Sequence, residues 1–131
     1  MRRLLPGPLL SLMLSDWLAV TNGSSGNMRM KIFSGHDGTV RNILLSLNVY
    51  GGLPSTPPPF ASSVVFELHQ DEDEESRYSV KMLWQPDVES APLVVRLPGC
   101  ADLCPLDHWV SLTSDVTIDM DTWTRHSSHI T

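Results

Sequence analysis

MRMKIFSGHDGTVRNILLSLN, residues 28–48, is the stretch of this sequence that decides its fold. Residues 28–33 alternate in polarity and end apolar, a pattern that predicts a β-strand. The turn SGHDG follows, and Thr39 then offers a hydroxyl suited to the N-cap of a helix. One face of that helix, which is predicted to run to about residue 48, carries Val40, Ile43, Leu44 and Leu47. A strand that turns directly into a helix is typical of an α/β fold.

Another helix is predicted upstream, over residues 8–20. Its apolar face repeats at helical spacing and consists of Leu10, Met13, Leu14, Trp17 and Leu18. Pro8 falls in the first turn, where proline is tolerated. The start of the chain also resembles a signal peptide, because Arg2 and Arg3 precede an apolar run, although Asp16 interrupts it. We favour the buried helix, and the run is too short and too broken by prolines to span a membrane.

The sequence after the glycine pair 51–52 and a proline-rich connection predicts an antiparallel hairpin. Two strand-like runs, residues 62–69 and 77–84, flank five consecutive acids at 71–75. The acids lack the ligand spacing of a calcium loop, so we interpret them as a solvated hairpin tip. A third run at 92–97 extends the sheet. These patterns predict an α/β fold in which helices flank a sheet that carries an added antiparallel hairpin.

A cysteine turn and a short helix follow this sheet. Cys100 and Cys104, in PGCADLCPL, are compatible with a short-range disulfide, with free thiols, or with half of a zinc site. No second Cys or Cys/His pair follows at a useful spacing for zinc. We favour the disulfide over free thiols, because it suits a tight turn bracketed by Pro98, Gly99 and Pro105, assuming an oxidising compartment. Residues 105–113 predict the helix, with core contacts from Leu106, Trp109, Val110 and Leu112. From about residue 119 the chain reads as a loose tail.

Composition sets limits on the function. The chain has 131 residues, 41% of them hydrophobic, which suits one small globular domain. Its net charge of −6 and scattered basic residues predict no nucleic-acid partner. We divide it into residues 1–27 (helix and loop, with a signal-like start), 28–118 (the main domain) and 119–131 (the tail).

The turn at His36 and Asp37 is the place that most resembles a ligand site. Ligands of open α/β sheets bind beyond the carboxyl ends of the strands, and the next helix offers free N–H groups and a positive dipole end. Gly35 and Gly38 allow the backbone to approach a ligand closely. A histidine can donate hydrogen bonds to phosphate oxygen, and an aspartic acid can protonate a leaving alkoxide. On this pattern alone, however, a capped turn is the commoner explanation.

The remaining polar signals are weaker. The spacing of the other histidines does not match a metal site. They are His69, His108, His126 and His129. We therefore predict no metal and no cofactor. Asn22-Gly23-Ser24 is a candidate N-glycosylation acceptor if the chain enters the secretory pathway.

Several motifs, in the right order, resemble the histidine acid phosphatases, the family of the prostatic and lysosomal enzymes of animals. KIFSGHDGTVRNILLSLNVYGG is similar to the segment around the family's His-Asp motif. The likeness continues through PPPFASSVVFELHQ and YSVKMLW, and PLVVRLPGCADLCPL resembles the family's Pro-Gly-Cys-x-x-x-Cys-Pro-Leu turn. GPLLSLMLSDWLA is similar to the helix before the motif strand, so the resemblance covers residues 7–123. It implies the C-terminal part of a histidine-phosphatase-type sheet.

The resemblance also implies roles for individual residues. Such enzymes hydrolyse phosphate monoesters through a phosphohistidine intermediate. His36 would bind the phosphate, and Asp37 would donate the proton to the leaving alcohol. Cys100 and Cys104 would form a disulfide. A lysosomal or secreted location and a homodimer of the complete protein are further expectations.

Three departures from the family pattern limit these expectations. The family's nucleophilic histidine lies in an N-terminal Arg-His-Gly-x-Arg-x-Pro motif, whereas the only Arg-His pair here is Arg125-His126, followed by a serine. Ser63 stands where vertebrate members have a disulfide cysteine, and Gly38 replaces a usual threonine. Because covalent catalysis needs its nucleophile, we expect this chain alone to be inactive. The alternative is a catalytically inactive truncated relic, or a phosphate-binding or interaction protein.

Overall fold

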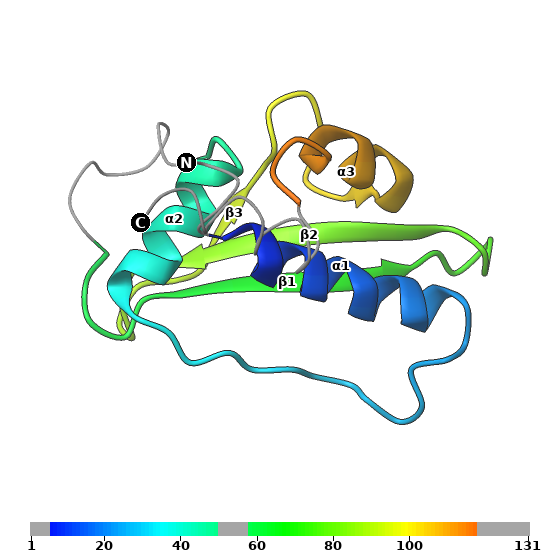
Figure 1. The fold of residues 1–131 in the computed structure, drawn as a ribbon, viewed down its shortest axis with the longest axis horizontal. Coiled ribbons are helices and arrows are strands. Elements are labelled where there is room, and N and C mark those ends of the chain that lie inside the picture. The colour runs from blue at the N-terminus through cyan, green and yellow to red at the C-terminus, as the bar shows by residue number, and fades with distance from the viewer. Residues whose placement is uncertain (1–5, 50–57, 118–131) are drawn as a thin grey trace, which may run out of the picture.

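A computed structural model describes residues 6–49 and 58–117 of the chain, and Figure 1 shows its fold. In chain order the elements are α1 (Gly7–Thr21), α2 (Asp37–Ser46), β1 (Ser63–Gln70), β2 (Tyr78–Gln85), β3 (Leu93–Val95), β4 (Cys104–Pro105) and α3 (Leu106–Thr113). The strands form one antiparallel sheet in the order β1–β2–β3, with β4 also paired to β2. The predicted α/β class is confirmed.

The hairpin of β1 and β2 forms most of the sheet, as the sequence predicts. Its register runs from Ser63 opposite Gln85 to Gln70 opposite Tyr78. On β2 the inward residues alternate with partly exposed ones, so that Val80, Met82 and Trp84 are buried. This period of two is the spacing at which a half-buried strand places apolar side chains on one face.

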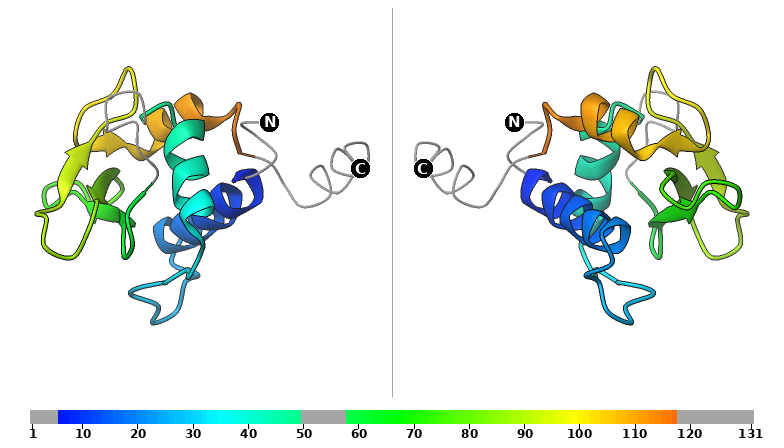
Figure 2. Two further views of the ribbon diagram at one scale, coloured as in Figure 1. Left: turned by 90° about the vertical axis from the view of Figure 1, so that its left-hand side faces the viewer. Right: turned by 90° about the vertical axis from the view of Figure 1, so that its right-hand side faces the viewer.

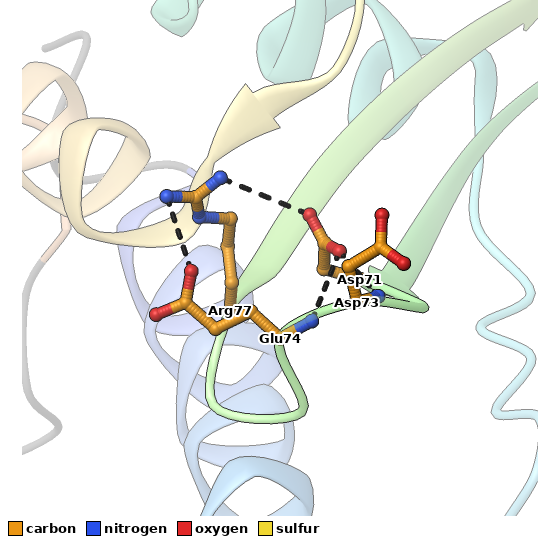
Figure 3. Close-up of polar contacts among 4 residues, drawn as sticks. All are labelled: Asp71, Asp73, Glu74 and Arg77. Carbon is orange, nitrogen blue, oxygen red and sulfur yellow. Dashed lines mark hydrogen bonds and ion pairs between the residues drawn. The ribbon is translucent and has the colours of Figure 1, made fainter.

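The acidic connection between β1 and β2 is a solvated hairpin tip, as predicted (Figure 3). Asp71 Oδ1 accepts the backbone N–H groups of Asp73 at 2.8 Å and Glu74 at 3.2 Å. The guanidinium of Arg77 lies 3.8 Å from Asp71 Oδ2 and 3.2 Å from Glu74 Oε2. These carboxylates are therefore used to shape the turn and to pair with one cation.

Helices cover one face of the sheet (Figure 2). Aromatic rings join these two layers. Trp17 of α1, Phe66 of β1 and Trp109 of α3 contact one another, with ring centroids 5.8 to 5.9 Å apart. Leu44 of α2 is fully buried. This packing confirms that residues 7–21 form a core helix, with Leu10 and Met13 buried and Pro8 in the first turn.

Two residues that were assigned to the core lie at the surface. Leu18 is 45% exposed and Leu112 is 36% exposed, whereas Leu106 and Trp109 are buried as predicted. Both misplaced leucines lie at the margin of an apolar helical stripe. Because the stripe is wider than the contact that covers it, its outermost members face solvent.

The strand predicted at residues 28–33 does not form. The segment runs extended and exposed outside the sheet, with Met30 77% and Ile32 82% exposed (Figure 1). A strand needs a neighbouring strand to satisfy its backbone groups, and within the described residues no strand pairs with this segment. Lys31 holds it to α1 through an ion pair of 2.7 Å with Asp16 Oδ2.

The helix after this segment begins earlier than predicted. The N-cap is His36 rather than Thr39, and the helix ends at Ser46 rather than at about residue 48. Asn48 has a positive φ of 60°, which turns the chain out of the helical path. The predicted helix stop at Gly51 and Gly52 lies outside the described residues. So do Arg2, Arg3, most of the proline-rich connection, Arg125, His126, His129 and the tail.

The cysteine turn is closed by the expected Cys100–Cys104 disulfide, whose Cα atoms lie 5.6 Å apart. Gly99 has a φ of 88°, a left-handed conformation that favours glycine. The two-residue strand β4, which the sequence did not predict, pairs Cys104 with Val80. In residues 6–49 and 58–117, no helix has both the length and the apolar character needed to cross a membrane.

Candidate active site

His36 lies at the junction between the extended segment and α2. Its backbone is extended, with φ −83° and ψ 166°, and its carbonyl oxygen accepts the N–H groups of Thr39 at 3.0 Å and Val40 at 3.3 Å. Its side chain makes no capping hydrogen bond and the residue is exposed. The backbone of His36 therefore starts the helix, while its imidazole remains available to a ligand.

Asp37 is the first residue of α2 and is also exposed. Its Oδ1 accepts the N–H of Gly38 at 2.8 Å. A negative charge at this position is favourable, because the N-terminus of a helix is the positive end of its dipole. The two predicted site residues thus lie side by side on one exposed helix start.

The helix start offers fewer free donors than the sequence suggested. The N–H of Gly38 is taken by the carboxylate of Asp37, and the N–H of Thr39 by the carbonyl of His36. An incoming phosphate would displace these bonds or rely on side chains. The exposed imidazole of His36 is a further N–H donor at this helix start.

The two glycines beside the site differ in their surroundings. A Cβ at Gly35 would lie 3.1 to 3.2 Å from the side-chain atoms of Thr39, whereas a Cβ at Gly38 would meet nothing within 4 Å. Gly35 thus allows the chain to pass closely under the first turn of α2. The threonine that the family pattern has at position 38 would fit without a clash at its Cβ.

Alanine at these two positions should have opposite effects on stability. We expect Gly35→Ala to destabilise the chain by about 1 kcal/mol, because Thr39 must shift to admit the methyl group. Gly38→Ala is the matched control, which should stabilise it by about 0.5 to 1 kcal/mol through helix propensity. Urea unfolding followed by circular dichroism measures both. Equal effects of the two substitutions would show that the close approach at Gly35 is unimportant.

The remaining described histidines have other partners. His69 lies on β1 with its Nε2 2.7 Å from Glu67 Oε2. His108 lies on α3 with its Nδ1 3.5 Å from the Sγ of Cys100. Sequence spacing did not predict this last contact, although the seven residues between Cys100 and His108 span only one turn and the start of a helix.

A hollow of about 220 Å³ lies at the opposite end of α2 from His36. Its lining comes from the ends of α2 and α3 and the turn after β3, and includes Ser46, Asn48, Leu97, Thr113 and Asp115. It does not include His36 or Asp37. His36 and Asp37 are themselves exposed, so the candidate site lies at the surface.

Comparison with known proteins gives a consistent set of relatives. The chain is 32% identical over 114 residues to lysosomal acid phosphatase of Xenopus laevis and 35% identical over 114 residues to that of Rattus norvegicus. It is 32% identical over 117 residues to venom acid phosphatase Acph-1 of Apis mellifera. The matches cover 87 to 88% of this chain but only 25 to 29% of each relative. No family model matches the sequence.

Proposed function

We propose, from the premise that this chain is a partial histidine acid phosphatase-like sequence, that it supplies His36 and Asp37 to a phosphate-monoester hydrolase. In this role His36 binds the phosphate and Asp37 is the proton donor. The observation that carries the proposal is the joint exposure of both side chains on the first turn of α2. The chain spans about a quarter of the length of these relatives, so the complete reaction is part of the proposal.

His36 binds the phosphate through the hydrogen bonds of its imidazole and through its position at the positive end of the helix dipole. Its imidazole stands at the N-terminus of α2, where the helix dipole favours an anion. A hydrogen bond from an imidazolium to a phosphate oxygen is charge-assisted and so stronger than a neutral one. Because two N–H groups of the first turn already have acceptors, the side chain is the donor that distinguishes this helix start from others.

Asp37 donates a proton to the leaving group. As the bond between phosphorus and the ester oxygen breaks, the leaving alkoxide takes the carboxyl proton of Asp37 and departs as an alcohol. Asp37 must carry that proton when the ester binds, which suits an acidic medium. The phosphoryl group passes to the nucleophile, which the resemblance assigns to the histidine of an Arg-His-Gly-x-Arg-x-Pro motif. The printed sequence does not contain this motif, so we infer that the chain alone does not turn over substrate.

A chimera tests this proposal. This chain replaces the matching quarter of rat lysosomal acid phosphatase, the relative with which it shares 35% identity. We expect the chimera to hydrolyse p-nitrophenyl phosphate at acid pH, and the isolated 131-residue chain to release no nitrophenol. Unaltered rat enzyme sets the reference rate. A chimera that folds, as judged by circular dichroism and a cooperative melt, but has no activity would contradict the proposal and favour the non-catalytic alternative.

We also propose that Asn22 carries a glycan when the chain passes through the secretory pathway, in keeping with relatives that are named as lysosomal and venom proteins. Asn22 is exposed at the end of α1, and its Oδ1 accepts hydrogen bonds from the backbone N–H and the hydroxyl of Ser24. The acceptor asparagine and the hydroxyl residue of the sequon are therefore adjacent and accessible.

Expression with a secretion leader in animal cells should give a chain that shifts to lower mass on treatment with an N-glycosidase. Asn22→Gln should abolish the shift, because it removes the acceptor amide from the sequon. Asn27→Gln, which alters an exposed asparagine outside any sequon, is the control and should retain it. An unshifted wild-type band would contradict the assignment.

A further inference from the structure

Two sulfur atoms and one imidazole nitrogen meet at the start of α3. The ligand atoms of Cys100, Cys104 and His108 all lie within 4.8 Å of one another. The closest approach of the imidazole is between His108 Nδ1 and Cys100 Sγ, at 3.5 Å. The donors come from the turn after β3, from β4 and from α3, so the fold assembles them from three short segments.

The backbone holds these donors in place independently of the bond between the sulfurs. Cys104 is 2% exposed, and its strand pairs with Val80 of β2. The N–H of Cys100 donates to the carbonyl of Leu97 at 3.0 Å. His108 lies in the first turn of α3, a helix anchored by buried Leu106 and Trp109. Opening the disulfide would therefore leave all three donors near one another.

We propose that, when the Cys100–Cys104 disulfide is reduced, Cys100, Cys104 and His108 form a binding site for a thiophilic divalent cation such as Zn²⁺. Two thiolates and one imidazole are a ligand set that Zn²⁺ accepts, with a fourth position left to water. His108 is exposed and Cys100 partly so, which gives a cation and that water access from solvent. The disulfide and the metal site exclude each other, because the same two sulfurs make both.

A dithiol can reduce the Cys100–Cys104 disulfide. The dithiol gives two electrons and two protons to the disulfide, leaving two cysteine thiols and becoming a disulfide itself. Zn²⁺ then binds both sulfurs and displaces their two protons. The sulfurs must move from bonding distance to about 3.8 Å apart, the separation of two ligands at about 2.3 Å in a tetrahedral site. Rotation of Cys100, which lies in the turn, supplies this movement while buried Cys104 stays in place.

Zinc titration of the full chain tests the site. The chain is reduced with a phosphine, freed of reductant without oxygen, and titrated with Zn²⁺ against a chromophoric chelator. We expect one tightly bound zinc per reduced chain and none above background for the oxidised chain. The background is set by the Cys100→Ser/Cys104→Ser double variant, which keeps the acidic tip and every histidine. Equal zinc binding by that variant, or by the oxidised chain, would overturn the proposal.

The imidazole distinguishes a folded site from two thiols in a disordered chain. His108→Ala should weaken zinc binding at least 10-fold, whereas His69→Ala, which alters an exposed histidine on β1, should leave it unchanged. Co²⁺ in place of Zn²⁺ should give thiolate charge-transfer bands and the intense visible bands of a tetrahedral ion. Unchanged affinity in His108→Ala, or a Co²⁺ spectrum identical with and without His108, would show that the imidazole is not a ligand.

Discussion

Asp37→Ala in the chimera should lower turnover of p-nitrophenyl phosphate by a factor of about 10² to 10⁴, the range that a positioned general acid contributes. The loss should appear in kcat, because the proton moves only as the ester bond breaks. Asp37→Asn sharpens the test, since its amide oxygen can still accept the N–H of Gly38 and only the proton is lost. Both variants should therefore be impaired while the start of α2 keeps its structure.

Asp107→Ala is the matched control for this prediction. Asp107 is an exposed carboxylate in the first turn of α3, and its Oδ1 accepts the N–H of the next residue, His108, at 2.9 Å. It therefore has the local geometry of Asp37 without its proposed role, and its removal should leave kcat within a factor of about two, in keeping with a surface change of at most ~0.5 kcal/mol. Equal losses of kcat in the two variants would show that Asp37 only stabilises the start of α2 and is not the proton donor.

Trp109→Ala should have the largest effect on stability, a loss of about 3 to 5 kcal/mol in the free energy of unfolding. Trp109 is 4% exposed, and its ring meets Trp17 at 5.8 Å and Phe66 at 5.9 Å. Removing it opens a cavity where α1, β1 and α3 converge. Since small domains have only about 5 to 15 kcal/mol of stability, this loss should remove a large fraction of the stability of the chain.

Urea unfolding of the wild-type chain and the variant, followed by far-ultraviolet circular dichroism, measures this loss. Leu112→Ala is the control on the same helix: its side chain is 36% exposed, and we expect a smaller loss, of about 1 kcal/mol. Trp109→Phe should fall between the two, because it keeps one ring in the cluster. If Trp109→Ala unfolds at the wild-type midpoint, the aromatic cluster does not hold the layers together.

Most of the local structure could be read from residue periodicity. The alternation in β2 and the helical spacing of Leu10, Met13 and Ile43 each fix which face of an element is apolar, and the structure buries those faces. The proposed site pair could also be named from the sequence, since His36 and Asp37 are neighbours in the chain and need no tertiary contact to meet. The disulfide could be predicted from a turn that resembles the family's, because its two cysteines are four positions apart in the sequence.

Two features could not be predicted from periodicity: which strands pair with each other, and how deeply the residues at the edge of a helix's apolar stripe are buried. Residues 28–33 have the pattern of a strand, but a strand forms only where another strand accepts its hydrogen bonds, and no sequence period specifies that partner. The exposure of Leu18 and Leu112 depends likewise on how much of each helix its neighbours cover.

By itself, then, the sequence determined the features whose stabilising contacts are local: the helices α1, α2 and α3, the hairpin, and the neighbouring positions of His36 and Asp37. Tertiary structure alone decided three things: that residues 28–33 pair with no strand among residues 6–49 and 58–117, that Trp17, Phe66 and Trp109 join the two layers, and that His108 lies beside Cys100. The physical reason is distance along the chain. Backbone periodicity encodes contacts within a few residues, whereas contacts between elements exist only after those elements have packed.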